Sequence, residues 1–160
     1  MPKMKRPGAF WIISVFLALA VVLLLLGQTT SIFAYDFAVR LGLQESVDEV
    51  TAFGVEMNRA FGASDTFVYI PLMIFSLIGL FMRKRWALLT TAAVMGISTY
   101  WAVTMAVVLV LLRDVPGYQL VPDLEYWIFL GAFVIFGTWG LFYLVFRGDK
   151  LLQRSGDDYE

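Results

Sequence analysis

Four stretches of the chain are long and apolar enough to cross a lipid bilayer, whose core of about 30 Å needs roughly 20 helical residues. They lie at residues 10–27, 66–81, 87–112 and 126–146. The second is the shortest, so it either begins a few residues earlier or lies where the bilayer is thin. With 60% of its 160 residues hydrophobic and 16% charged, the chain is too apolar for a soluble domain of this size. The sequence predicts an all-α membrane protein, a four-transmembrane-helix bundle that forms one domain over residues 1–160.

The basic residues predict the orientation of these spans, because Lys and Arg concentrate in short segments that stay in the cytoplasm. Most of them precede the first span, join the second to the third, or follow the fourth: Lys3, Lys5, Arg6, Arg83, Lys84, Arg85, Arg147, Lys150 and Arg154. The opposite side carries Arg40, Arg59 and Arg113 and most of the carboxylates. We therefore expect a multi-pass protein of the plasma (inner) membrane, with both termini cytoplasmic and residues 147–160 as a cytoplasmic tail. The basic N-terminus is followed by no clear small-x-small cleavage site, so we interpret it as part of an uncleaved first span.

An amphipathic helix is predicted at residues 46–61, in the extracytoplasmic segment between the first two spans. Its apolar face consists of Val47, Val50, Gly54, Met57 and Phe61. Ser46 and Glu49 form a capping box at its start, and Gly62 supplies a stop. We expect this helix to lie flat on the outer interface or to cap the bundle, either as a connector or as a lid or partner-docking helix.

Several polar side chains fall inside the predicted spans, whereas no charged residue does, so proton coupling through a buried acid is not expected. Ser98 and Thr99 can bond to carbonyls one turn earlier in their own helix. The polar tips of aromatic side chains need partners elsewhere, because an unpaired polar group in hydrocarbon costs roughly 2 to 7 kcal/mol. We expect a polar seam between the second and third spans formed by Tyr69, Ser76, Tyr100, Trp101 and Thr104. The seam either only holds the helices together or opens outward as a ligand-binding pocket.

Small residues indicate where the spans approach one another closely. Ala92 and Gly96 form a small-xxx-small pair in the third span. Gly137 and Gly140 leave one side of the fourth span without side chains, where a neighbouring helix can approach. Such spacings also occur by chance, so they predict packing and not a dimer.

Four carboxylates lie at the extracytoplasmic ends of the spans: Asp65, Asp114, Asp123 and Glu125. Converging acids can bind a cation or act as an acid and base pair. The alternative is a set of hydrated helix-end residues, with Asp65 as an N-cap and Asp123 near a helix start. Four spans with acids at the outer ends of the third and fourth resemble the layout of the lipoprotein signal peptidases. The stretches LLRDVPG and VPDLEYW do not reproduce the Asn- and Gly-rich signatures of that family, so no catalytic residue is carried over.

The chain has no cysteine and no histidine. This composition excludes thiolate chemistry, imidazole ligation of haem or metals, and histidine as a general base. Any acid or base chemistry would have to use Asp, Glu, Lys or Tyr. The sequence assigns no catalytic residue, no cofactor and no metal site.

Three functions remain open at this point. The first is a small non-catalytic integral membrane protein that acts as a partner-binding or assembly subunit, with the lipid bilayer and another membrane protein as partners and no nucleic acid. The second is a binder or transporter of a small apolar molecule in the polar seam. The third is a membrane hydrolase that uses the extracytoplasmic carboxylates.

Overall fold

The computed structural model describes residues 6–152, and this part of the chain contains helices and turns but no strand. The elements in chain order are α1 (Gly8–Leu24), η1 (Leu25–Thr29), α2 (Thr30–Phe33), α3 (Tyr35–Arg40), α4 (Val47–Ser64), η2 (Asp65–Tyr69), α5 (Ile70–Phe81), α6 (Trp86–Leu112), α7 (Leu124–Arg147) and α8 (Asp149–Leu152). Two of them, η1 and η2, are π-helical turns, in which one extra residue is accommodated inside a longer helix.

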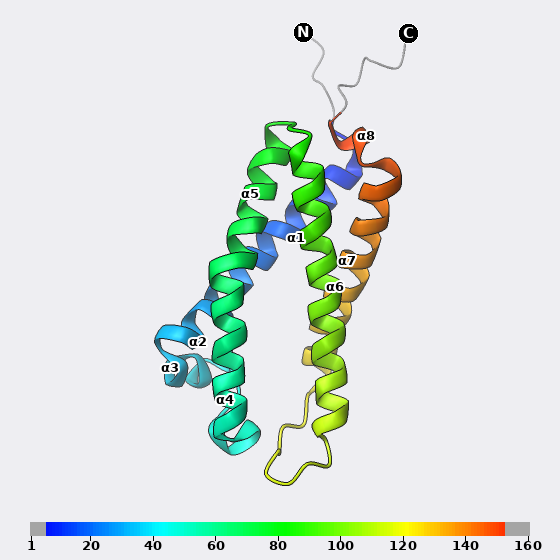
Figure 1. Cartoon of the computed structure of the whole chain (residues 1–160). Helices are drawn as coiled ribbons and strands as arrows, with labels where there is room; N and C mark the ends of the chain where they lie inside the picture. The colour runs from blue at the N-terminus through cyan, green and yellow to red at the C-terminus, as the bar shows by residue number, and fades with distance from the viewer. Residues whose placement is uncertain (1–5, 153–160) are drawn as a thin grey trace, which may run out of the picture.

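Several elements join end to end, so that four helices are long and apolar enough to cross a membrane. They are Gly8–Phe33, Val47–Phe81, Trp86–Leu112 and Leu124–Arg147. The expectation of four long apolar helices is confirmed. In Figure 1 the start of α1, the turn between α5 and α6, and α8 lie at one end, and α3 and the loop between α6 and α7 lie at the other.

The two ends differ in charge, and we name them accordingly. The basic end holds Arg6, Arg83, Lys84, Arg85, Arg147 and Lys150. The opposite end, which we call the acidic end, holds most of the carboxylates. Of the basic residues that predicted the orientation, Lys3, Lys5 and Arg154 lie outside the described residues.

The second long helix differs from its prediction, because α4, η2 and α5 continue into one another without a break at Gly62. The expectation of a separate helix that stops at Gly62 is therefore wrong. A Cβ atom at Gly62 would lie only 2.6 Å from the Gln28 carbonyl oxygen and would also collide with the Ser31 hydroxyl. The glycine allows η1 and α2 to approach this helix, and it does not act as a stop.

The start of this helix is predicted correctly. It begins at Val47, and the Ser46 N–H and hydroxyl both donate to the Glu49 carboxylate, at 2.7 and 2.8 Å. Thr51 then interrupts the helical backbone with φ 66° and ψ 168°. The interruption frees the Glu49 carbonyl, which accepts from the backbone N–H groups of the α6–α7 loop at Gln119 (2.7 Å) and Leu120 (3.1 Å).

Close contact between α6 and α7 depends on small residues of α7. A Cβ at Gly137 would lie 2.6 Å from the Thr99 hydroxyl, and one at Gly140 would lie 2.7 Å from the Met95 sulfur, so the predicted contact at these glycines is confirmed. The prediction for Gly96 is wrong, because a Cβ there would meet nothing within 4 Å.

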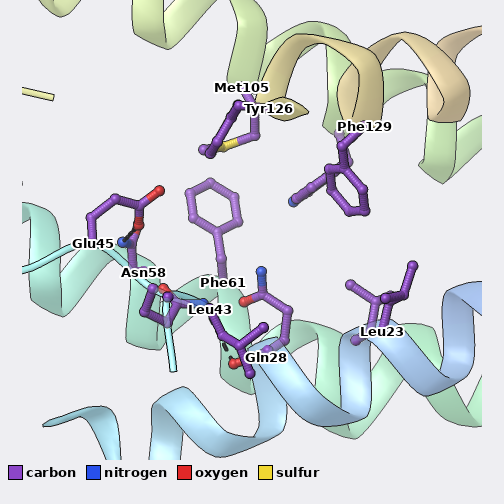
Figure 2. Close-up of a pocket in the computed structure, with 14 residues that line it drawn as sticks. Leu23, Gln28, Leu43, Glu45, Asn58, Phe61, Met105, Tyr126 and Phe129 are labelled. Carbon is purple, nitrogen blue, oxygen red and sulfur yellow. Dashed lines mark hydrogen bonds between the residues drawn. The ribbon is translucent and has the colours of Figure 1, made fainter. Parts of the chain in front are cut away.

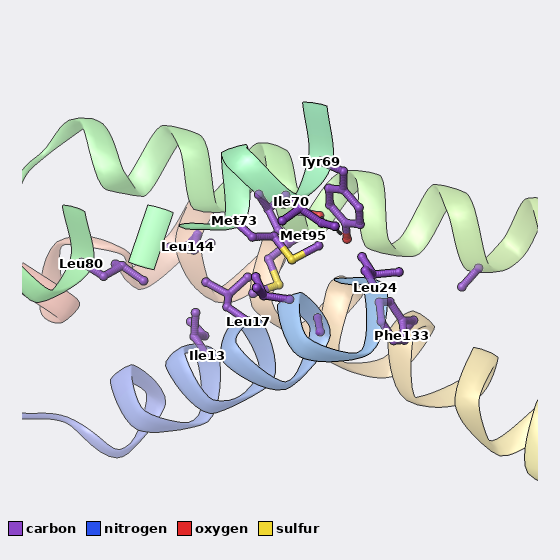
Figure 3. Packing of buried hydrophobic residues seen from close by; sticks show 14 of the residues in the cluster. Ile13, Leu17, Leu24, Tyr69, Ile70, Met73, Leu80, Met95, Phe133 and Leu144 are labelled. Atoms are coloured by element: carbon purple, nitrogen blue, oxygen red, sulfur yellow. Dashed lines mark hydrogen bonds between the residues drawn. The ribbon is translucent and has the colours of Figure 1, made fainter. Parts of the chain in front are cut away.

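The four long helices share one apolar core (Figure 3). The labelled core residues come from all four: Ile13, Leu17, Leu24, Tyr69, Ile70, Met73, Leu80, Met95, Phe133 and Leu144. At the basic end, the Arg6 guanidinium donates to the last carbonyls of α5, at Leu80 (3.3 Å) and Phe81 (2.9 Å). A cation is favourable there, because the C-terminus of a helix carries partial negative charge and unpaired carbonyls.

Candidate functional site

The predicted polar seam is formed only in part. The Tyr69 side chain is 3% exposed, and its hydroxyl is hydrogen-bonded to the Ser98 hydroxyl of α6. Ser76 is also buried between these helices, although its hydroxyl makes no hydrogen bond within the described residues. As predicted, Ser98 and Thr99 donate to carbonyls one turn earlier in α6, at 3.0 and 3.1 Å.

The other three seam residues lie elsewhere. Tyr100 is 74% exposed on the outside of the helices, so its predicted place in the seam is wrong. Thr104 lines the same outer groove as Tyr100. Trp101 faces α7, where its ring packs against Phe129 and Phe133 at centroid distances of 6.1 and 5.6 Å. Successive residues of an α-helix point about 100° apart, which is why neighbours in this polar stretch face different surroundings.

The four predicted carboxylates also separate into two kinds. Asp114, Asp123 and Glu125 are exposed at the acidic end, and Asp123 caps α7 by accepting from the Tyr126 N–H at 2.9 Å. Among the described residues, no group of three or more acids is placed to hold a metal ion. The placement gives no support to a shared site for acid and base chemistry.

Asp65 differs from these three because it is only 6% exposed. Its predicted role as a hydrated N-cap is wrong, since the helix runs continuously through it and no free N-terminus exists there. Its Oδ2 atom is buried and makes no hydrogen bond within the described part of the chain. One of the four long apolar helices thus contains a buried acid, just before the predicted span 66–81.

A cavity of about 290 Å³ lies between α1, η1, the 42–45 segment, α4, α6 and α7. Its apolar wall consists of Leu23, Leu24, Leu43, Phe61, Met105 and Phe129. Its polar lining residues are Gln28, Gln44, Glu45, Asn58, Trp101 and Tyr126. Figure 2 shows the Phe61 ring and the Gln28 amide pointing into the space enclosed by these residues. We call this space the acidic-end cavity.

The acidic-end cavity lies in the half of the helices toward the acidic end. Trp101 is about 22 Å along α6 from Trp86 at about 1.5 Å per residue. Tyr126 and Phe129 lie in the first turns of α7. Asn58, Phe61, Asp65 and Tyr69 follow one another at helical spacing on one side of the continuous α4–η2–α5 helix. Asp65 therefore lies about one turn nearer the basic end than Phe61, and the buried Tyr69 follows it.

A hydrogen-bond network holds the polar end of the cavity. The Asn58 amide donates to the Glu45 carboxylate at 2.7 Å and to the Tyr35 hydroxyl at 3.2 Å. The Tyr35 hydroxyl donates to the Glu45 carbonyl at 2.9 Å. Burial, with a smaller contribution from the Glu45 carboxylate, raises the pKa of Tyr118 above its usual value. Glu45 is thus fixed in position at the acidic end and faces the α6–α7 loop.

Two polar atoms of the lining residues are buried without a partner. The Trp101 Nε1 donor and the Gln28 Oε1 acceptor make no hydrogen bond within the described residues. Buried polar atoms are normally satisfied by protein or water. These two atoms have almost no accessible surface, so they do not open onto the free space of the cavity. Among the described residues, no Lys or Arg lines the cavity.

Sequence reasoning identified Trp101 and Asp65 but missed Gln28, Glu45 and Asn58. One signal was available, because Gln28 directly follows the apolar run of the first span. Glu45 and Asn58 gave no comparable signal, since polar residues outside the spans are ordinary.

Comparison of the chain with protein-family models, with curated proteins and with solved structures gives no match.

Proposed function

We propose that this is a non-catalytic multi-pass protein of the plasma (inner) membrane that binds a small amphiphilic molecule in the acidic-end cavity. In this proposal the four long helices form a transmembrane bundle, both termini are cytoplasmic and the cavity lies near the extracytoplasmic surface. The concentration of Lys and Arg at the basic end supports this orientation.

The observation that carries the proposal is the cavity itself, whose wall is apolar and aromatic and whose polar end holds the Glu45 carboxylate and the Asn58 amide. Ligand pockets are mainly apolar, with a few placed polar groups that orient the guest. An apolar cavity of about 150 Å³ is large enough for benzene. A volume of about 290 Å³ therefore suits a single ring with a short polar chain.

Binding of the neutral probe 3-phenylpropanol tests the proposal. The full chain in dodecyl maltoside should show a saturable change in tryptophan fluorescence as the probe is added. The change should be lost in Trp101→Phe and kept in Trp139→Phe, because Trp139 packs on Tyr143, outside the cavity lining.

A second pair of variants tests whether the probe binds in the cavity or only enters the detergent micelle. Gly27 lines the cavity, and a Cβ there would meet only the Leu43 carbonyl, at 3.8 Å, so Gly27→Leu should fill the space without a severe clash. Gly131→Leu adds the same bulk where a Cβ would meet nothing within 4 Å. Loss of the response in Gly27→Leu alone is expected, and an equal response in both variants and in the wild type would contradict the proposal.

A specific observation favours partner binding as a second function. Tyr100 is 74% exposed and lines an almost wholly apolar groove of about 520 Å³ together with Gly96, Thr104 and Leu141. A phenol that faces hydrocarbon gains from a hydrogen-bond acceptor on a neighbouring membrane helix. We propose this groove as the contact for a second membrane protein.

Photocrosslinking in native membranes tests this second function. Benzoylphenylalanine in place of Tyr100 should give one discrete protein adduct, whereas the same residue in place of the exposed Leu89 should not. Adducts of equal yield at both positions, or only with lipid, would contradict partner binding through this groove.

A further inference from the structure

The charged groups that line the acidic-end cavity are of one sign. The Glu45 carboxylate lies at its polar end. Among the described residues, no Lys or Arg lines the cavity. Of the cations at this end of the chain, Arg59 pairs with Glu56 at 3.1 Å, Arg40 lines a separate groove beside α3, and Arg113 is exposed just after α6 and is not a lining residue.

The acceptor at the polar end of the cavity points to the charge of the guest. The Glu45 carboxylate accepts from the Asn58 amide through Oε2. A carboxylate can accept several hydrogen bonds, so Glu45 keeps capacity for another donor. An anionic guest would have to lie near the Glu45 carboxylate with no lining cation to offset it, which is unfavourable in a site of low dielectric constant.

The aromatic side chains favour the same kind of guest. Four aromatic side chains line the cavity: Phe61, Trp101, Tyr126 and Phe129. The faces of aromatic rings attract cations. These rings and the leucines of α1 also provide an apolar surface for the body of the ligand.

We propose that the ligand of this cavity is a cationic amphiphile, with a protonated amine bonded to Glu45 and an apolar ring lying against Trp101 and Phe129. This inference rests on the proposed binding function, and it adds the charge class of the ligand. The phosphate of a zwitterionic lipid headgroup would find no cation here, so a simple monocation fits the lining better.

Three probes with one skeleton test the charge class: 3-phenylpropylamine, 3-phenylpropanol and 3-phenylpropanoate, which at pH 7 are cationic, neutral and anionic. Each is titrated by calorimetry into the full chain in dodecyl maltoside. A charge-assisted hydrogen bond exceeds a neutral one by roughly 1.4 kcal/mol, so the amine should bind about tenfold more tightly than the alcohol. The carboxylate should bind more weakly than the alcohol.

Glu45→Gln should reduce the preference for amine over alcohol to about twofold, because the neutral amide keeps the shape without the charge. Glu125→Gln makes the same change at an exposed residue outside the cavity lining and should keep the full preference. Glu45→Gln alters the bond to Asn58. If this variant does not fold, the order of the three probe affinities for the wild type still tests the charge class.

The outcomes separate the two proposals. Binding of none of the three probes would overturn the proposed binding function and this inference with it. Equal binding of amine and alcohol would leave the binding function standing and overturn the charge class. An amine preference that is undiminished in a folded Glu45→Gln would overturn the assignment of Glu45 as the partner of the ammonium group.

Discussion

The hydroxyl groups of Thr29 and Thr66 lie 2.9 Å apart and join η1 to η2. Each π-helical turn is thus held against the other by a direct side-chain contact between the first and second long helices. Thr66 immediately follows the buried Asp65, and Thr29 immediately follows Gln28, so this bond lies beside the polar groups of the candidate site. π-Helical turns are frequently found at functional sites.

Replacing Thr66 by the isosteric Val removes this bond. Hydrogen bonds between membrane helices average about 0.6 kcal/mol, so the free energy of unfolding should fall by roughly 0.5 to 1 kcal/mol. Chemical unfolding in detergent measures the change. After Thr66→Val, the further change Thr29→Val should have a much smaller effect than it has alone, and additive losses would show that the two hydroxyls do not stabilise one another.

Gly137→Ala should weaken the contact between α6 and α7. The new methyl group would lie 2.6 Å from the Thr99 hydroxyl and 2.9 Å from the Met95 carbonyl oxygen, and overpacking of this kind costs about 1 to 3 kcal/mol. Gly131→Ala, on the same helix, meets nothing within 4 Å and should be neutral or slightly stabilising, because Ala is the better helix former. Equal thermal midpoints for the two variants would contradict the close approach at Gly137.

Thr51→Gly should stabilise the protein. Thr51 has φ 66° and ψ 168°, a conformation that glycine adopts without strain and that costs other residues about 1 to 3 kcal/mol. After the entropy cost of the added glycine, a gain of about 1 kcal/mol is expected in the free energy of unfolding. Thr51→Ala retains the strain and serves as control, so a glycine variant no more stable than the alanine variant would show that this backbone is unstrained.

Arg6→Met should destabilise the basic end. The guanidinium donates to the carbonyls of Leu80 and Phe81 and lies 4.0 Å from the centre of the Phe10 ring. Loss of these contacts should cost about 1 to 2 kcal/mol in the free energy of unfolding. Arg6→Lys keeps the charge but not the planar fork, so its stability should lie between those of the wild type and Arg6→Met. If Arg6→Lys is no more stable than Arg6→Met, the stabilisation comes from the geometry of the guanidinium and not from its charge.

Features that depend on neighbouring residues could be predicted from the sequence. Long apolar runs require helices that satisfy their own backbone hydrogen bonds, and this gave the four long helices. The Ser46 and Glu49 contact, the Asp123 cap and the bonds of Ser98 and Thr99 to their own helix are equally local.

The candidate site could not be predicted in this way, because membrane helices face lipid and one another with equally apolar surfaces, and hydropathy therefore does not reveal which side of a helix is inside. The tertiary structure turned Trp101 toward α7 and left Tyr100 exposed, although the two are adjacent in the sequence. It also made Gly62 a point of close approach within a continuous helix and brought Gln28, Glu45 and Asn58 to one cavity from separate segments. Burial of a polar group depends on which helices pack around it, and that packing is set by all four helices together and not by the residues on either side.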